Sequence, residues 1–179
     1  MIIAAVLFVL FLIVLIIFAF PQFSPIPYFP SNPKDLPLIV KALKLKQNHT
    51  IFDLGAGDGI IVFEAARESL RNKLNTQFVA VEMNPILVFI LHIRRILHPN
   101  RKNIKIILGD MFKIHYQSLT PKNNSVGIYI YVSPRFIPKI IQTVQSQFNH
   151  FEFTSYYYSI EKDMKPSAEG VHAVYTKTY

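Results

Sequence analysis

The sequence predicts an α/β protein with a doubly wound, mostly parallel sheet that ends in an antiparallel strand pair and follows one transmembrane helix. Short apolar runs of strand length alternate with helical patterns, which is typical of βαβ units. The C-terminal tail holds two β-rich runs joined by a polar segment with no helical pattern. The first twenty residues are almost purely aliphatic and aromatic.

Residues 1–20 are predicted to form the transmembrane helix. From Ile2 to Phe20 the chain has no charge, amide, glycine or proline, and such a run spans roughly the 30 Å of bilayer hydrocarbon. A cleaved signal peptide would need a basic leader and a small-x-small cleavage site, and the sequence offers neither. Lysines follow the helix and no basic residue precedes it, so a single-pass membrane protein is expected, with its C-terminal domain facing the cytoplasm.

Residues 21–34 are predicted to be a proline-rich connector, because proline cannot continue a helix. Residues 35–179 then form the α/β domain. Asp35 is expected to cap a short helix whose first turn contains Pro37. Further strands are expected at 50–54, 78–82, 104–108 and 126–132, helices at 59–70, 85–97 and 134–148, and the two β-rich runs of the tail at 151–160 and 171–179.

Composition excludes several kinds of chemistry. The chain has no cysteine, so it has no disulfide, thiolate metal site or cysteine nucleophile. Its six histidines show no zinc-ligand spacing, and no metal is expected. No G-x-S-x-G motif supports a serine hydrolase. The net charge of +8 suits an anionic leaflet or acidic partners, but it equally suits a composition shaped by an AT-rich genome; no nucleic-acid partner is expected.

A glycine-rich turn stands where the first strand hands over to the next helix, in Phe52-Asp53-Leu54-Gly55-Ala56-Gly57-Asp58-Gly59. A nicotinamide-binding fingerprint would need a further glycine at the position of Ile60. The G-x-G-x-G spacing with Asp53 upstream instead resembles the first motif of class I methyltransferases, whose cofactor is S-adenosyl-L-methionine. The loop residues expected to bind it are Gly55, Ala56, Gly57 and Gly59.

Three acidic residues close successive predicted strands, at the sheet edge where doubly wound folds bind ligands. Asp53 is a candidate partner for the positively charged methionine end of the cofactor. Glu82, followed by Met83, could accept both ribose hydroxyls. Asp110 could accept from the adenine amino group while Met111 packs on the ring. Taken singly, each acid also fits a helix cap or a turn.

The end of the fourth predicted strand is where a methyl acceptor would meet the donor. Tyr131, Ser133 and Pro134 are the candidate catalytic residues, with Tyr131 and Ser133 orienting the acceptor. An ordinary helix start explains Ser133 and Pro134 equally well, as an N-cap followed by proline in the first turn.

Nearly the whole chain resembles the small membrane-anchored protein-lysine N-methyltransferases, the adenine nucleotide translocase and ATP synthase c-subunit lysine methyltransferase family. The resemblance rests on the apolar N-terminus, the glycine loop and five further segments, which are Pro27-Tyr28-Phe29-Pro30-Ser31, Glu82-Met83-Asn84-Pro85, Gly109-Asp110-Met111-Phe112, a strand ending in Val132-Ser133-Pro134, and Glu169-Gly170-Val171-His172-Ala173-Val174-Tyr175. It implies lysine N-methylation of a membrane-associated protein, with Tyr28 folding over the cofactor. Ile60 departs from the pattern, since these relatives carry an arginine there.

Two other functions remain open on the sequence. A membrane anchor would serve a methyltransferase that acts on a lipid or small lipophilic molecule equally well. A membrane-tethered protein that binds S-adenosyl-L-methionine without turnover is the third possibility.

Overall fold

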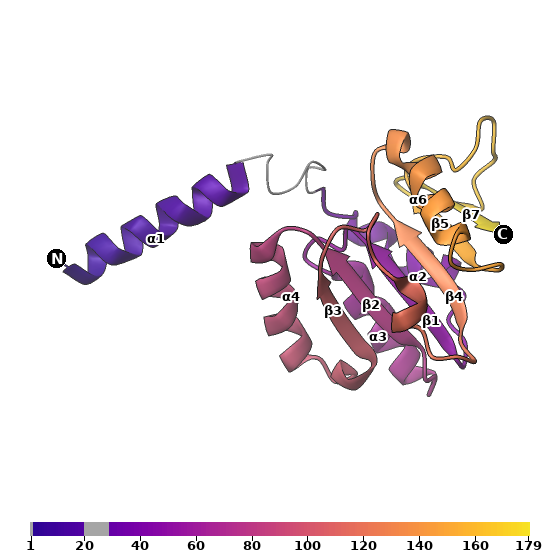
Figure 1. The fold of residues 1–179 in the computed structure, drawn as a ribbon, viewed down its shortest axis with the longest axis horizontal. Helices are drawn as coiled ribbons and strands as arrows, with labels where there is room; N and C mark the ends of the chain where they lie inside the picture. Colours follow the sequence, from indigo (N-terminus) through magenta and orange to yellow (C-terminus); the bar gives the residue numbers. More distant parts are fainter. Residues whose placement is uncertain (1, 20–28) are drawn as a thin grey trace.

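The computed structural model describes residues 2–19 and 29–179 and shows a helix, α1 (Ile2–Ala19), and an α/β domain (Figure 1). The domain is built on a seven-stranded sheet of order β3-β2-β1-β4-β5-β7-β6. The strands are β1 (His49–Leu54), β2 (Gln77–Glu82), β3 (Ile104–Leu108), β4 (Ser125–Ile130), β5 (Glu152–Tyr156), β6 (Ala168–Glu169) and β7 (Ala173–Thr178).

Strand directions confirm the predicted sheet. The strands β3, β2, β1, β4 and β5 are parallel to one another, whereas β7 runs antiparallel to both β5 and β6. Every residue of β1 is buried, as expected for a central strand with both faces covered. The two-residue β6 was not predicted, and it lies inside the polar segment between the two predicted tail strands.

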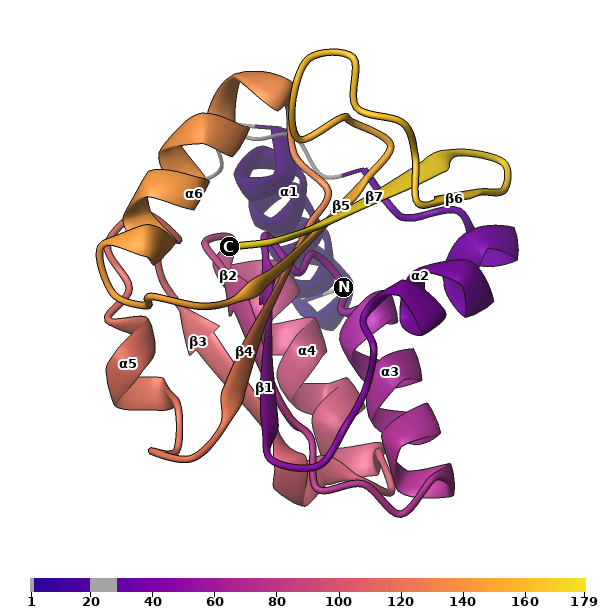
Figure 2. The same cartoon turned by 90° about the vertical axis from the view of Figure 1, so that its right-hand side faces the viewer.

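Helices cover both faces of the sheet (Figure 2). They are α2 (Leu36–Ala42), α3 (Ile60–Arg71), α4 (Pro85–Leu97), α5 (Tyr116–Leu119) and α6 (Ile137–Gln145), with 3₁₀ turns η1 (Pro33–Asp35), η2 (Arg101–Asn103) and η3 (Pro134–Phe136). Side chains of α2, α3 and α4 join one hydrophobic cluster, and those of α5 and α6 join the other. The helix predicted at 134–148 therefore forms as a 3₁₀ turn followed by the shorter α6.

The helix predicted at the start of the chain forms as α1. Its large apolar side chains from Ile2 to Leu15 are 40–82 % exposed. Within residues 2–19 and 29–179, no helix meets both the length and the apolarity needed to cross a bilayer. Part of the predicted connector lies outside the described residues; at its described end Ser31 is buried, with its hydroxyl 3.2 Å from that of Tyr129.

The sequence predicted that Asp35 caps α2. Asp35 is the N-cap residue of this helix, but its side chain makes no capping hydrogen bond. Its carboxylate accepts hydrogen bonds from the Tyr156 hydroxyl at 2.7 Å and from the backbone N–H groups of Val171 and His172 at 2.7 and 2.9 Å. These partners come from the far end of the chain, so the residue closes the domain rather than a helix.

Candidate functional site

The glycine loop between β1 and α3 is built from left-handed turns. Gly55, Gly57 and Gly59 have φ values of +81°, +58° and +78°. Residues other than glycine adopt this left-handed conformation only at a cost in free energy. The N–H groups of Gly55 and Ala56 donate to the Val81 carbonyl at 2.9 and 3.0 Å, which fixes the loop against β2. Gly55 is exposed, so its bare backbone faces an approaching ligand.

Glu82, the last residue of β2, holds the loop in place. Its Oε2 accepts from the Gly57 N–H at 2.8 Å, and its Oε1 accepts from the N–H groups of Met83 and Asn84, each at 2.9 Å. Each carboxylate oxygen has two acceptor positions, so Oε2 retains one for a ligand hydroxyl. The sequence predicted a ligand contact for Glu82 but not its bond to the loop.

The other end of the loop is fixed by α4. One Arg94 nitrogen (Nη1) donates to the Asp58 carboxylate at 2.5 Å and to its carbonyl at 2.7 Å, and the guanidinium lies 4.9 Å from the Phe63 ring centroid. On the sequence alone, His92, Arg94 and Arg95 are expected on the solvated face of this helix. His92 is exposed as expected, whereas Arg94 and Arg95 are only partly exposed, and Arg95 Nε donates to the Ile104 carbonyl at 2.6 Å.

Asp53 is the most unusual group at this edge. It lies one residue before the end of β1, in register with Ala80 of β2 and Tyr129 of β4, and is 3 % exposed. Burial, and then repulsion from Glu82 and Asp58, raises the pKa of its carboxyl well above the ordinary value. No described residue donates a hydrogen bond to its carboxyl group. A cationic ligand would therefore stabilise the ionised Asp53 carboxylate, which none of the described residues stabilises by a hydrogen bond.

Asp110 and Met111 follow β3, beside Glu82, whose backbone is in register with Leu108. Asp110 Oδ1 accepts from the Phe112 N–H at 2.9 Å, so the turn interpretation holds in part. The Met111 side chain is buried, and its Cε would lie 3.5 Å from a Cβ added at Gly55. The predicted alignment of the three acids is confirmed, because β3, β2 and β1 are neighbours and all three acids stand at their carboxyl ends.

Aromatic rings gather beyond the end of β4. The Tyr131 ring lies edge-on to that of Tyr156, with centroids 4.9 Å apart, and 6.4 Å from that of Tyr157. The Tyr157 ring in turn lies 4.7 Å from that of His172. Tyr157 has φ +74°, a strained conformation for a bulky residue and a frequent mark of functional sites. Burial, and then the neighbouring Tyr158 and Tyr157, raises the pKa of Tyr131.

Ser133 and Pro134 occupy a helix start. Ser133 is the N-cap residue of η3 and Pro134 is in the first turn, but the Ser133 side chain makes no capping hydrogen bond. The helix-start interpretation therefore explains its backbone and leaves its hydroxyl for another partner.

The candidate site residues meet at one sheet edge, apart from one that cannot be placed. Tyr28, predicted to cover the cofactor, lies outside the described residues. The described part of the chain contains no group of three or more histidine or acidic side chains that could hold a metal ion. The anchoring role of Arg94 and the position of the His172 ring were not predicted, since only the folded chain brings them to the loop and to the tyrosine cluster.

Sequence comparisons relate the chain to methyltransferases. It is 24 % identical over 122 residues to an ATP synthase c-subunit lysine N-methyltransferase from Xenopus laevis, covering 68 % of this chain and 48 % of that protein. The Caenorhabditis elegans protein of the same name is 32 % identical over 94 residues, covering 49 % and 46 %. The chain thus spans about half the length of these relatives. A probable ribosomal RNA small subunit methyltransferase A from Methanosarcina mazei is 35 % identical over 78 residues, covering 44 % and 26 %. No protein-family model matches the chain.

Solved structures show the same fold. An RNA methyltransferase from Salinibacter ruber, in complex with S-adenosyl-L-homocysteine, superposes with a TM-score of 0.69 at 19 % identity, covering 84 % of this chain and 93 % of that one. A Geobacter sulfurreducens methyltransferase in complex with the same molecule gives a TM-score of 0.53 at 15 % identity, covering 84 % and 55 %. The chain therefore has the Rossmann-like methyltransferase fold, and its sequence resembles the ATP synthase c-subunit lysine methyltransferases.

Proposed function

We propose that this chain is an S-adenosyl-L-methionine-dependent methyltransferase that N-methylates a lysine of a membrane-associated protein. The observation that carries the proposal is Asp53, a buried carboxyl that lies near two other acids, Glu82 and Asp58, and beside an exposed glycine turn. Pyrophosphate cofactors would place more negative charge near these acids, whereas S-adenosyl-L-methionine brings an ammonium and a sulfonium. The relatives and structural neighbours support the same cofactor.

The residues present fit this cofactor. Asp53 would hold the positively charged methionine end against the open backbone of Gly55, and the remaining acceptor position of Glu82 Oε2 would take a ribose hydroxyl. Asp110 and Met111 would meet the adenine. Bound S-adenosyl-L-methionine supplies an electrophilic methyl group, so the protein needs no nucleophile of its own.

The acceptor is proposed to meet the donor at Tyr131 and Ser133. A free lysine has a pKa of about 10.4, and a partly desolvated position beside the tyrosine rings would favour its neutral, nucleophilic form. The side chains then act mainly by alignment and by exclusion of water. The lysine assignment draws support from the two relatives named for lysine methylation.

Membrane attachment is the second part of the proposal. The uncharged α1, with its exposed apolar side chains, would anchor the chain, leaving the domain on the cytoplasmic side. Attachment would bring the site to a membrane-associated substrate.

A transfer experiment tests the function. The full chain would be incubated with S-adenosyl-L-methionine carrying a labelled methyl group and a native membrane extract, and protein, lipid and RNA fractions would be separated. Label in protein, found on a lysine, is the expected result. Label in lipid or RNA would replace the proposed acceptor, and cofactor binding with no labelled fraction would make the chain a non-catalytic binding protein.

Substitutions at the end of β4 test the acceptor site. We expect Tyr131→Phe and Ser133→Ala each to lower kcat by about tenfold or more while leaving cofactor affinity within about twofold, because both are assigned to the acceptor. Ser125→Ala, at the opposite end of the same strand, is the matched control. Full turnover in both site variants would refute the assignment.

A further inference from the structure

The outward face of α4 is apolar, contrary to the solvated face expected for a helix at the surface of a domain. Phe89, Ile93, Ile96 and Leu97 are 65 %, 46 %, 64 % and 80 % exposed, and their spacing places them along one side of the helix. Leu108 of β3, the neighbouring edge strand, is 59 % exposed. These five residues are here called the α4 face. Large apolar side chains exposed together in this way mark an interaction site.

Both arginines of α4 are engaged with the domain. Arg94 pairs with Asp58 and Arg95 donates to the Ile104 carbonyl, and both residues are only partly exposed, whereas the four apolar side chains that the helix contributes to the α4 face are more exposed. His92 is the exposed polar side chain left between Phe89 and Ile96. The helix thus holds the glycine loop through Arg94 and exposes apolar side chains on its outer side.

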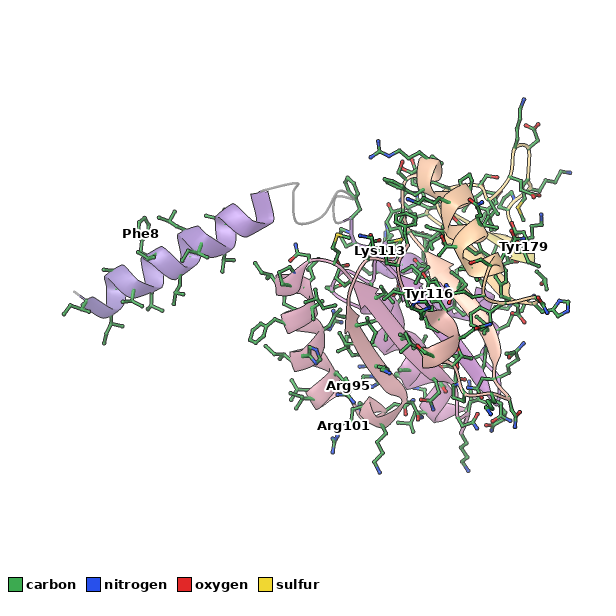
Figure 3. All side chains as sticks on the ribbon, viewed as in Figure 1. Phe8, Arg95, Arg101, Lys113, Tyr116 and Tyr179 are labelled. Carbon is green, nitrogen blue, oxygen red and sulfur yellow. The ribbon has the colours of Figure 1, made fainter. Side chains whose placement is uncertain are left out.

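The charged residues of the segment that contains α4 and β3 are all basic. From Met83 to Gly109 the sequence contains no aspartate or glutamate. Exposed basic side chains follow the C-terminal end of the helix, at Arg101, Lys102 and Lys105. Arg101 lies at that end of α4, at the periphery of the molecule (Figure 3). An apolar helix face followed by exposed lysine and arginine side chains complements the acyl chains and headgroups of an anionic membrane.

We infer that the α4 face docks on an anionic membrane surface, with Phe89, Ile93, Ile96 and Leu97 entering the interfacial region and Arg101, Lys102 and Lys105 contacting lipid headgroups. Docking would fix the orientation of the domain, beyond any tethering by α1. Because α4 begins directly after Glu82-Met83-Asn84, it would also hold the candidate site beside the membrane. The inference does not depend on methyl transfer, although the proposed attachment through α1 would strengthen it.

The absence of cysteine allows a direct test. Single nitroxide labels would be placed on the full chain through Ile93→Cys and Leu97→Cys, with Lys122→Cys, an exposed loop position before β4, as the control. Each labelled protein would be reconstituted in phosphatidylcholine vesicles with and without about 30 % phosphatidylglycerol. Collisions with oxygen and with a water-soluble nickel complex report how deeply each label lies in lipid.

We expect the oxygen-to-nickel ratio at the two α4 labels to rise about threefold or more in the anionic vesicles, with no change at the control. Adding Arg101→Gln and Lys102→Gln should lower the docked population by about fivefold per charge. Vesicle co-sedimentation without a change at α4 would overturn the inference and leave attachment through α1 intact. Absence of co-sedimentation would overturn both the docking of the α4 face and the attachment through α1. Dipolar broadening between labels of different molecules would identify a second copy as the occupant and likewise overturn it.

Discussion

Asp53 is the acid of the candidate site whose pKa is raised, because it is buried and lies near Glu82 and Asp58. A raised pKa means that the carboxyl of the free protein is protonated over a wider pH range than an ordinary aspartate. A cation binds the ionised form better, so ligand binding must drive proton release near that pKa. The cofactor affinity should then increase as pH rises through the pKa of Asp53.

The substitution Asp53→Asn tests this account at constant shape. We expect S-adenosyl-L-methionine affinity to fall by about tenfold or more and its dependence on pH to flatten, because the variant has no charge to develop. Calorimetry in two buffers of different ionisation enthalpy would measure the proton released by the original protein and its loss in the variant. Equal affinity in both proteins would remove Asp53 from the binding site.

His49 carries a different pH dependence, at the amino end of β1. Its ring is fully buried, and burial, assisted by Lys46, lowers its pKa to about 4. Above about pH 6.5 the residue is neutral in both folded and unfolded chains and has no effect on stability. Between about pH 6.5 and 4 only the unfolded chain gains the proton, so the free energy of unfolding falls as pH falls.

Urea denaturation at pH 7 and pH 5 would measure that loss. We expect His49→Gln to reduce the difference between the two pH values by about 2 kcal/mol relative to the original protein, whatever the substitution costs at pH 7. His150→Gln, at an exposed histidine, should leave the difference unchanged. An identical pH dependence in all three proteins would show that His49 titrates normally.

At the scale of elements, the packing of α3 against α4 depends on Gly59. A Cβ there would clash with the Leu91 side chain and lie 2.8 Å from Phe63 Cε2, in a backbone with φ +78°. Gly55 has nearly the same φ, +81°, but an added Cβ would meet no atom closer than 3.5 Å. The pair therefore separates backbone strain from steric overlap.

We expect Gly55→Ala to cost about 1–2 kcal/mol of unfolding free energy, from the left-handed conformation alone. Gly59→Ala should cost a further 1–3 kcal/mol or so, because the core must also accommodate a methyl group. Chemical denaturation of both variants would give the difference. Equal losses would mean that Leu91 and Phe63 move aside freely.

The elements that could be predicted from sequence are those with a repeating apolar pattern. The bounds of α4 and β3 agree with the prediction, and β1, β2 and α3 differ by one residue at their ends. A single turn such as α5 is too short to show a helical period, and β6 is a two-residue pairing within polar sequence. The acids of the site were found because strand ends define the ligand edge. The direction of Arg94 was not, since periodicity alone did not reveal that its guanidinium reaches back to the glycine loop.

At the scale of the whole molecule, Asp35 joins the two ends of the α/β domain. Its bonds to Val171 and His172 connect residues 136 and 137 positions apart, and its bond to Tyr156 adds β5. Burial opposes the charged form, but these hydrogen bonds outweigh it and lower the pKa of the carboxyl. A contact between residues so far apart in the chain leaves no local pattern, so the residues around Asp35 predict only a helix cap.

This junction also supports the aromatic cluster of the proposed acceptor site, because Tyr156 and His172 belong to both. We expect Asp35→Ala to lower the free energy of unfolding by about 3 kcal/mol or more, since a buried hydroxyl and two N–H groups lose a charged acceptor. Tyr156→Phe should lower it by about 1–2 kcal/mol, since only one of the three hydrogen bonds to Asp35 is lost. Asp163→Ala, at an exposed acid of the tail, is the control for charge. Denaturation measured by circular dichroism would rank the three, and a loss for Asp35→Ala no greater than for the control would show that the two ends of the domain are held together by other contacts.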